Sequence, residues 1–129
     1  IDSKNPLFII EDGIIYNKAK TEIIVVAINK ENYKISNGVT EIPYETFSSM
    51  NKMKSIVIPG TITKIGNNAF SNCTELTKIE IPSSVTSIGE NCFINTRNLK
   101  EIVINKPKGS IAGAPWGNMY GDRAIIWNK

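Results

Sequence analysis

Apolar and polar positions alternate in the segment LTKIEIP in the manner of a half-buried β-strand. Ile79 and Ile81 point to one side of this strand, whereas Lys78 and Glu80 point to the other. Pro82 ends the strand because proline has no N–H group to donate to a neighbouring strand. The pattern therefore predicts a strand with one buried face and one face in water.

The same pattern recurs along most of the chain at a spacing of 23 residues. Identical residues at this spacing are Ile56 and Ile79, Pro59 and Pro82, Gly66 and Gly89, and Phe70 and Phe93. The frame extends upstream to Tyr33 and Phe47, and downstream to Trp116 and Trp127. We therefore predict five stacked strands, at residues 33–35, 56–58, 79–81, 102–104 and 125–127.

Each repeat is interpreted as one coil of a solenoid. After the strand, Val85 and Ile88 return beneath the sheet, Gly89 supports a turn, and residues 90–93 form a single helical turn that brings Phe93 inward. One coil cannot bury its apolar face alone, so stacking supplies the core. The period is that of a leucine-rich repeat. It predicts an α/β, mostly β, short right-handed stack of 23-residue repeats, with an aromatic column of Phe47, Phe70, Phe93 and Trp116.

Two apolar runs precede the repeats, at residues 14–16 and 23–28, and the polar segment NKAKTE joins them. This arrangement predicts a β-hairpin. The end of a solenoid exposes its core and a strand edge, so the hairpin is expected to act as a lid on the first repeat. The chain is thus interpreted as one leucine-rich-repeat domain, 1–129, with an N-terminal hairpin cap at 1–29, four repeats at 30–121 and a terminal strand at 122–129.

The string x-I-x-I-P-x-x-V-T-x-I-G-x-x-A-F-x-x-C-x-x-L, carried by residues 56–76 and less completely by 79–99, resembles the BspA-like leucine-rich repeat family. The segments DGIIYNKAKTEI and GSIAGAPWG resemble a hairpin and a terminal segment found in that family. Departures from its pattern include Ser36, Pro43, Cys92 and Thr96. The resemblance implies a secreted or surface-anchored protein of a bacterium or a protist, without catalytic activity. Several members of the family are associated with adhesion to host or matrix proteins.

Composition excludes several kinds of chemistry. The chain has no histidine, so catalytic triads and histidine-containing metal sites are not available to it. Its 15 basic and 12 acidic side chains are scattered, which predicts no nucleic-acid groove. The longest apolar run, residues 23–28, is far too short to enter and cross a bilayer. We expect no cofactor, no metal and no membrane insertion.

Cys73 and Cys92 lie 19 residues apart, without the second cysteine pair or the histidines of a zinc site. Two buried free thiols are the favoured interpretation, although the count alone leaves a disulfide open. Asn72-Cys73-Thr74 matches a glycosylation sequon, and we interpret it as a coincidence of the repeat.

The water-facing side of the predicted sheet is the candidate ligand face, because solenoids present such continuous surfaces for recognition. Its residues form two rows, the first of Asn32, Ser55, Lys78 and Glu101, and the second of Lys34, Val57, Glu80 and Val103. Lys78 and Glu101 are expected to face one another, and the two valines are unusual on a wet face. Trp116 is predicted to be a core residue. Trp127 is a possible end contact, because no repeat follows its strand.

Three functions remain for a chain of this pattern. The first is a non-enzymatic protein-binding or adhesion module, whose partner is a host or matrix protein or a glycan. The second is a structural spacer without a ligand of its own. A carboxylate-dependent hydrolase is disfavoured, because it requires two close acids in a cleft. The chain begins Ile1-Asp2-Ser3, without an initiator methionine or a signal sequence, so we interpret it as a mature or excised fragment of an extracellular or cell-surface protein.

Overall fold

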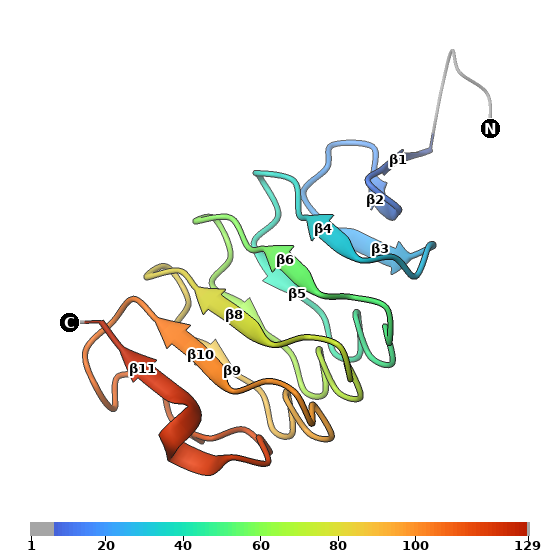
Figure 1. Ribbon diagram of the computed structural model, residues 1–129. Coiled ribbons are helices and arrows are strands. Elements are labelled where there is room, and N and C mark those ends of the chain that lie inside the picture. The colour runs from blue at the N-terminus through green and yellow to red at the C-terminus, as the bar shows by residue number, and fades with distance from the viewer. Residues whose placement is uncertain (1–6, 129) are drawn as a thin grey trace.

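The computed structural model describes residues 7–128, so the first six residues of the expected cap and Lys129 lie outside the described residues. The described chain is a stack of coils, shown in Figure 1. Its outer sheet consists of β4 (Asn32–Lys34), β6 (Ser55–Val57), β8 (Lys78–Ile81), β10 (Glu101–Ile104) and β11 (Ile125–Trp127). These are the five predicted strands, although the first four begin one residue earlier than expected.

The outer strands are parallel and pair in the predicted register. Tyr33 lies opposite Ile56, and Ile102 lies opposite both Ile79 and Ile125, so equivalent residues of successive repeats are neighbours. The hydrogen-bonded ladder is interrupted once. β4 pairs with β6, and β8 pairs with β10 and β11, but β6 and β8 belong to separate sheets. The sequence pattern gives no sign of this interruption.

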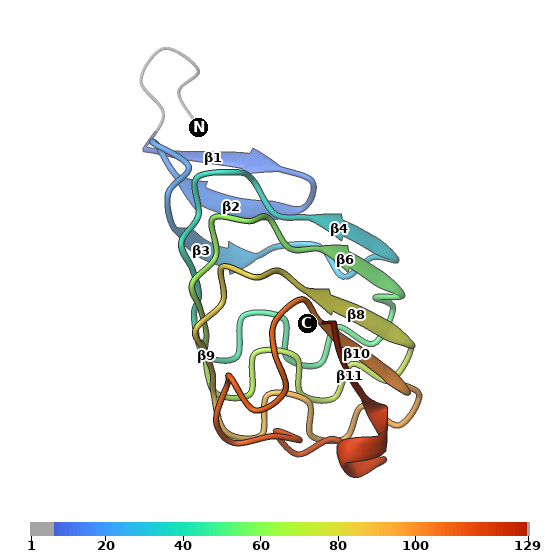
Figure 2. The same cartoon turned by 90° about the vertical axis from the view of Figure 1, so that its left-hand side faces the viewer.

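A second parallel sheet, of β5 (Glu41–Ile42), β7 (Lys64–Ile65) and β9 (Ser87–Ile88), lines the returning half of each coil. Figure 2, in which the C-terminal end faces the viewer, shows β10 and β11 on one side of the coil and β9 on the other. Val85 and Ile88 point into the core, as predicted. Strands here were not predicted, because a two-residue strand has no alternation to detect.

Residues 90–93 do not form the predicted helical turn. The only helix among residues 7–128 is the short 3-10 helix η1 (Gly121–Ala124). The first three coils instead turn on two residues with left-handed backbone, and these recur every 23 positions. They are Glu45, Asn68 and Asn91 in one series and Ser49, Asn72 and Asn95 in the other. Asparagine tolerates this conformation better than other residues with a side chain, which explains its abundance in these turns.

Gly89 is required for a reason other than the expected turn. Its backbone is not left-handed, but it lies directly against the preceding coil. A Cβ atom at position 89 would lie 2.4 Å from the Asn67 backbone nitrogen, and one at Gly66 would lie 2.5 Å from the Tyr44 nitrogen. Real Cβ atoms do not approach backbone so closely, so these glycines permit coil-on-coil contact.

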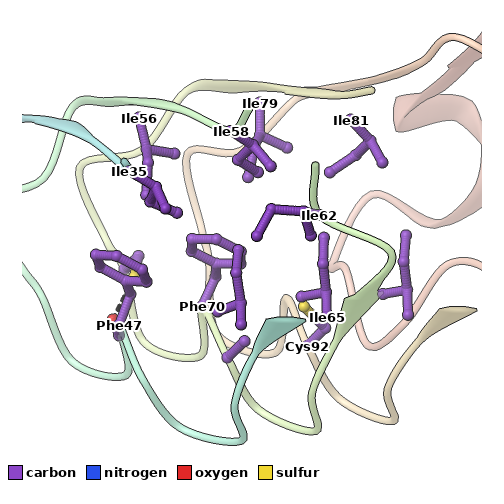
Figure 3. Packing of buried hydrophobic residues seen from close by; sticks show 14 of the residues in the cluster. Ile35, Phe47, Ile56, Ile58, Ile62, Ile65, Phe70, Ile79, Ile81 and Cys92 are labelled. Carbon is purple, nitrogen blue, oxygen red and sulfur yellow. Dashed lines mark hydrogen bonds between the residues drawn. The ribbon is translucent and has the colours of Figure 1, made fainter. Parts of the chain in front are cut away.

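The aromatic column is confirmed. The rings of Phe47 and Phe70 are stacked with centroids 5.5 Å apart, and those of Phe70 and Phe93 are stacked at 5.9 Å. Trp116 meets Phe93 edge-to-face at 6.3 Å and is only 2 % exposed. Figure 3 shows Phe47 and Phe70 side by side within the isoleucine-lined core.

Both cysteines are free and fully buried, in agreement with the favoured interpretation. Burial raises the pKa of the Cys73 thiol to about 12, and it raises the pKa of the Cys92 thiol as well. Neither thiol therefore forms the reactive thiolate at neutral pH.

The N-terminal cap is a three-stranded antiparallel sheet of β1 (Phe8–Glu11), β2 (Ile14–Asn17) and β3 (Ile23–Val26). The predicted hairpin is its β2–β3 half, and β1 was not predicted. Ile14 and Tyr16 bury their side chains against the first repeat. The Ser36 N–H donates to the Tyr16 hydroxyl at 2.9 Å, and Asp12 accepts from both the Lys34 N–H and the Lys30 ammonium. The cap thus joins the solenoid through apolar contact and a few hydrogen bonds.

Candidate functional site

The first row of the candidate ligand face is exposed along its whole length. The Ser55 hydroxyl donates to the Asn32 amide oxygen at 2.6 Å, which links two coils. Lys78 and Glu101 occupy opposite positions in β8 and β10, as predicted. The ion pairs among the described residues join other side chains, so Lys78 and Glu101 present separate charges to solvent.

The second row differs from the prediction at Val103. Lys34, Val57 and Glu80 are exposed, and Val57 has 56 % of its surface in solvent, but Val103 is only 8 % exposed. The reason is the pairing of the strands. Val103 lies in register between Glu80 and Ile126, so it has a larger side chain opposite it on each of the two strands that flank it. Val57 has a paired strand on one side alone, because the ladder stops between β6 and β8.

A hollow of about 260 Å³ lies where the ladder is interrupted. Its walls are Ile56, Val57, Ile58, Glu80, Pro82 and Asn105. The Asn128 amide donates to the Asn105 oxygen at 3.0 Å, and the Asn105 amide donates to the Glu80 carboxylate at 3.2 Å. This relay fixes the carboxylate beside exposed Val57. Asn105 and Asn128 were not among the predicted site residues, although their spacing of 23 marks them as one row.

Trp127 is half-buried at the C-terminal end of the stack. Its ring lies 6.4 Å from that of Trp116, and it lines a hollow of about 500 Å³ together with Lys108, Asp122 and Ile125. Trp116 is a core residue, as predicted, and its indole N–H donates to the Ala112 carbonyl at 2.8 Å. Trp127 therefore both closes the core and presents one side to the end hollow.

Asn72 of the sequon has a structural part in the turn. It is one of the left-handed residues, its amide oxygen accepts from Asn95 at 2.9 Å, and Cys73 beside it is fully buried. Within residues 7–128 there is no group of three His, Cys, Asp or Glu side chains placed to hold a metal ion. The same part of the chain contains no helix with the length and apolar character that crossing a membrane requires.

Parallel strands stacked at 23-residue intervals, each followed by a short return, define a leucine-rich-repeat solenoid. The sequence profile of the BspA type leucine rich repeat region, in six copies, matches residues 26–114. The chain belongs to this family. No curated protein sequence matches it significantly.

Solved structures agree with the family. A leucine-rich repeat protein from Eubacterium ventriosum is similar over 98 % of this chain, with 26 % identity and a TM-score of 0.77. A leucine rich cell surface protein from Faecalibacterium prausnitzii is 32 % identical over 57 % of the chain, with a TM-score of 0.55. The pneumococcal vaccine antigen PcpA shares the fold over 98 % of the chain at 19 % identity, with a TM-score of 0.65. The chain spans 34 %, 19 % and 38 % of these proteins, respectively.

Proposed function

We propose that this chain is a non-enzymatic binding or adhesion module of a secreted or surface-anchored protein, and that it binds a protein through the outer face of β4, β6, β8 and β10. A similar solved structure is that of a bacterial cell surface protein, which supports the location. The partner class is a host or matrix protein, with a glycan as the other candidate.

One observation carries this proposal. Val57 exposes 56 % of its surface beside a hollow, on a strand whose other outward residue, Ser55, is polar. Next to it stands the Glu80 carboxylate, held by Asn105 and without an ion-pair partner among the described residues. An apolar side chain beside a positioned charge is the combination that protein interfaces use, because the first contributes burial and the second contributes specificity.

A spacer function has support of its own. The aromatic side chains form an unbroken series from Tyr33 to Trp127, with neighbouring ring centroids between 5.4 and 6.4 Å apart. Gly66 and Gly89 bring successive coils into backbone contact. Such a stack is stiff because every coil is packed on its neighbours. It would hold another domain at a fixed distance without binding anything.

The test is an affinity screen of the 1–129 chain against immobilised matrix proteins and glycans, followed by Val57→Asp and Lys78→Glu. Each of these substitutions on the outer face should lower the affinity for a bound partner tenfold or more, while the thermal midpoint of the chain stays unchanged. Lys64→Glu is the matched control, because Lys64 is exposed on the second sheet. Binding that survives both outer-face changes would exclude this face, and a screen without any partner would favour the spacer.

A further inference from the structure

Cations from two coils gather around Tyr120 near the C-terminal end. The Lys100 ammonium lies 5.8 Å from the Tyr120 ring centroid, and the Arg123 guanidinium carbon lies 5.7 Å from it. The Tyr120 hydroxyl donates to the Arg97 backbone carbonyl at 2.6 Å, which joins the ring to the segment that carries Arg97, and Arg97 itself lines the hollow described below. These three cations are exposed. The repeat brings them together, because position 100 and position 123 are one period apart, although the sequence alone shows only scattered charges.

The cluster is held in place. The Tyr120 N–H donates to the Asn118 amide oxygen at 2.8 Å, and the buried Asn118 amide donates to the Leu99 carbonyl at 2.9 Å. The Arg123 Nε–H donates to the Tyr120 carbonyl at 3.1 Å. A cation over an aromatic face gains electrostatic stabilisation, so Tyr120 orders the two side chains that approach it. Ordered cations lose less conformational entropy when a ligand binds.

The positive charge of the cluster is not neutralised within the described chain. The ion pairs among residues 7–128 join Lys20 to Glu11, Lys30 to Asp12 and Lys54 to Glu31, and none involves Arg97, Lys100 or Arg123. Lys54, Lys100 and Arg123 occupy the same position of their repeats, but of these three side chains only Lys54 forms an ion pair among the described residues. Three carboxylates are close in sequence, those of Glu75, Glu101 and Asp122, and none of them pairs with these cations.

A hollow of about 350 Å³ adjoins the cluster. It is lined by Asn72, Thr74, Asn95, Arg97 and Met119. The amides of Asn72 and Asn95 are hydrogen-bonded to each other at 2.9 Å and stand in register on successive coils. Met119 exposes 62 % of its surface at the edge of the hollow. The hollow therefore offers a guanidinium, amide and hydroxyl groups, and one apolar side chain.

We propose that this surface, consisting of the hollow and the cations around Tyr120, binds an anionic glycan. Arg97 pairs with a carboxylate or sulfate of the sugar, since guanidinium matches the geometry of both. The Asn72 and Asn95 amides and the Thr74 hydroxyl bind sugar hydroxyl groups, and Met119 packs on the C–H face of a ring. Lys100 and Arg123 extend the contact to the next anionic unit. None of these residues belongs to the strands of the outer face, and the proposal does not depend on the function of that face.

An acidic peptide also carries carboxylates, but the observations favour the glycan. A peptide ligand is commonly held through its backbone on a strand edge or through its apolar side chains in pockets, whereas four of the five residues that line this hollow are polar and none lies in a strand. Its polar groups are short amides and a hydroxyl, which suit a ligand that presents a hydroxyl at nearly every carbon.

The experiment measures binding of the 1–129 chain to heparin, hyaluronan and neutral dextran near physiological salt. Heparin tests a sulfated glycan and hyaluronan a carboxylated one. We expect one of the two to bind, and dextran not to bind. The triple variant R97A/K100A/R123A should weaken that binding tenfold or more, because each charge-assisted hydrogen bond that is lost lowers the affinity for the glycan. Its thermal midpoint should stay close to that of the parent chain, since the three side chains are exposed.

The matched control is K18A/K52A/K64A, which removes the same amount of positive charge from exposed lysines elsewhere. This variant should retain binding. Equal losses in both triple variants would show a response to net charge alone and would overturn the proposal. The proposal would also be overturned if neither anionic glycan bound, or if a DNA duplex or an acidic peptide bound as tightly as the glycan. Val57→Asp should leave glycan binding unchanged, which separates this site from the outer face.

Discussion

Strands of the solenoid alternate buried and exposed side chains, whereas strands of the N-terminal cap are apolar on both sides. In β8, Ile79 and Ile81 are buried while Lys78 and Glu80 face water. In β3, Ile23 and Val26 are buried, but Ile24 and Val25 between them are exposed. Apart from Val103 in β10, the solenoid strands from β4 to β10 are thus packed on one face, as expected for half-buried strands. The cap contacts the first coil with one face, while its other face remains apolar.

The difference shows two ways of fixing a strand. In the solenoid every inward side chain meets its counterpart 23 residues away, so the contacts of one coil are repeated in the next. The cap has no such counterpart, and its place depends on Ile14, Tyr16 and the hydrogen bonds of Asp12. We therefore expect substitutions in the stacked core to affect the whole chain, and substitutions at the cap junction to act locally.

The largest effect is expected in the aromatic column. Phe70→Ala removes a fully buried ring that is stacked on both Phe47 and Phe93, and it should lower the free energy of unfolding by about 3–5 kcal/mol. The matched change in the cap is Ile10→Ala on its exposed side, which should shift that free energy by no more than about 0.5 kcal/mol. Urea denaturation monitored by tryptophan fluorescence measures both. Similar midpoints for the two variants would contradict the stacked core.

Contact between coils provides the second test. Gly89→Ala places a methyl group against the Asn67 backbone, and overpacking of this kind costs about 1–3 kcal/mol. Gly60→Ala is the control, because no atom lies within 4 Å of a Cβ at that position and its backbone is not left-handed. This second substitution should be neutral or stabilise by up to about 1 kcal/mol through the unfolded state. Equal thermal midpoints for the two variants would show that Gly89 is not required for close contact between the coils.

The sequence was sufficient for the features that repeat over several coils. The five outer strands, the aromatic column and the core position of Trp116 all follow from one spacing, because each position is supported by several copies. Features that depend on the neighbours of a single strand were missed. Val103 was expected in solvent, but its burial depends on paired strands on both sides, which alternation within one strand does not report.

Two missed features did leave a signal at the same spacing. The asparagines at positions 68 and 91, and at 72 and 95, recur in register, and this pattern indicates left-handed turns where a helical turn was expected. Lys100 and Arg123 are also one period apart, and Arg97 is one period before Tyr120. In a repeat sequence, charged residues that are one period apart should therefore be compared with one another before a cluster of charge is excluded.

The smallest expected effect concerns Asp12, which joins the cap to the first repeat. Burial of the Asp12 carboxyl by itself raises its pKa, but hydrogen bonds from Lys30 and from the Lys34 N–H outweigh this, so the pKa lies below its ordinary value of 3.8. A carboxyl with a lowered pKa in the folded state stabilises that state above its ordinary pKa. The stabilisation is lost as the pH falls through the lowered value.

Asp12→Asn should therefore cost less than about 1 kcal/mol at neutral pH, because the Asp12–Lys30 pair is partly exposed and screened by solvent. Amide hydrogen exchange shows which strands lose stability in the variant. Amides of β1, β2 and β3 should exchange faster in the variant, while those of β8 and β10 should keep their protection. The parent chain should show the same selective loosening of the cap below about pH 4, and the variant should not add to it. Equal acceleration of exchange in β8 would mean that the cap and the solenoid open together, which would remove the distinction between the two ways of fixing a strand.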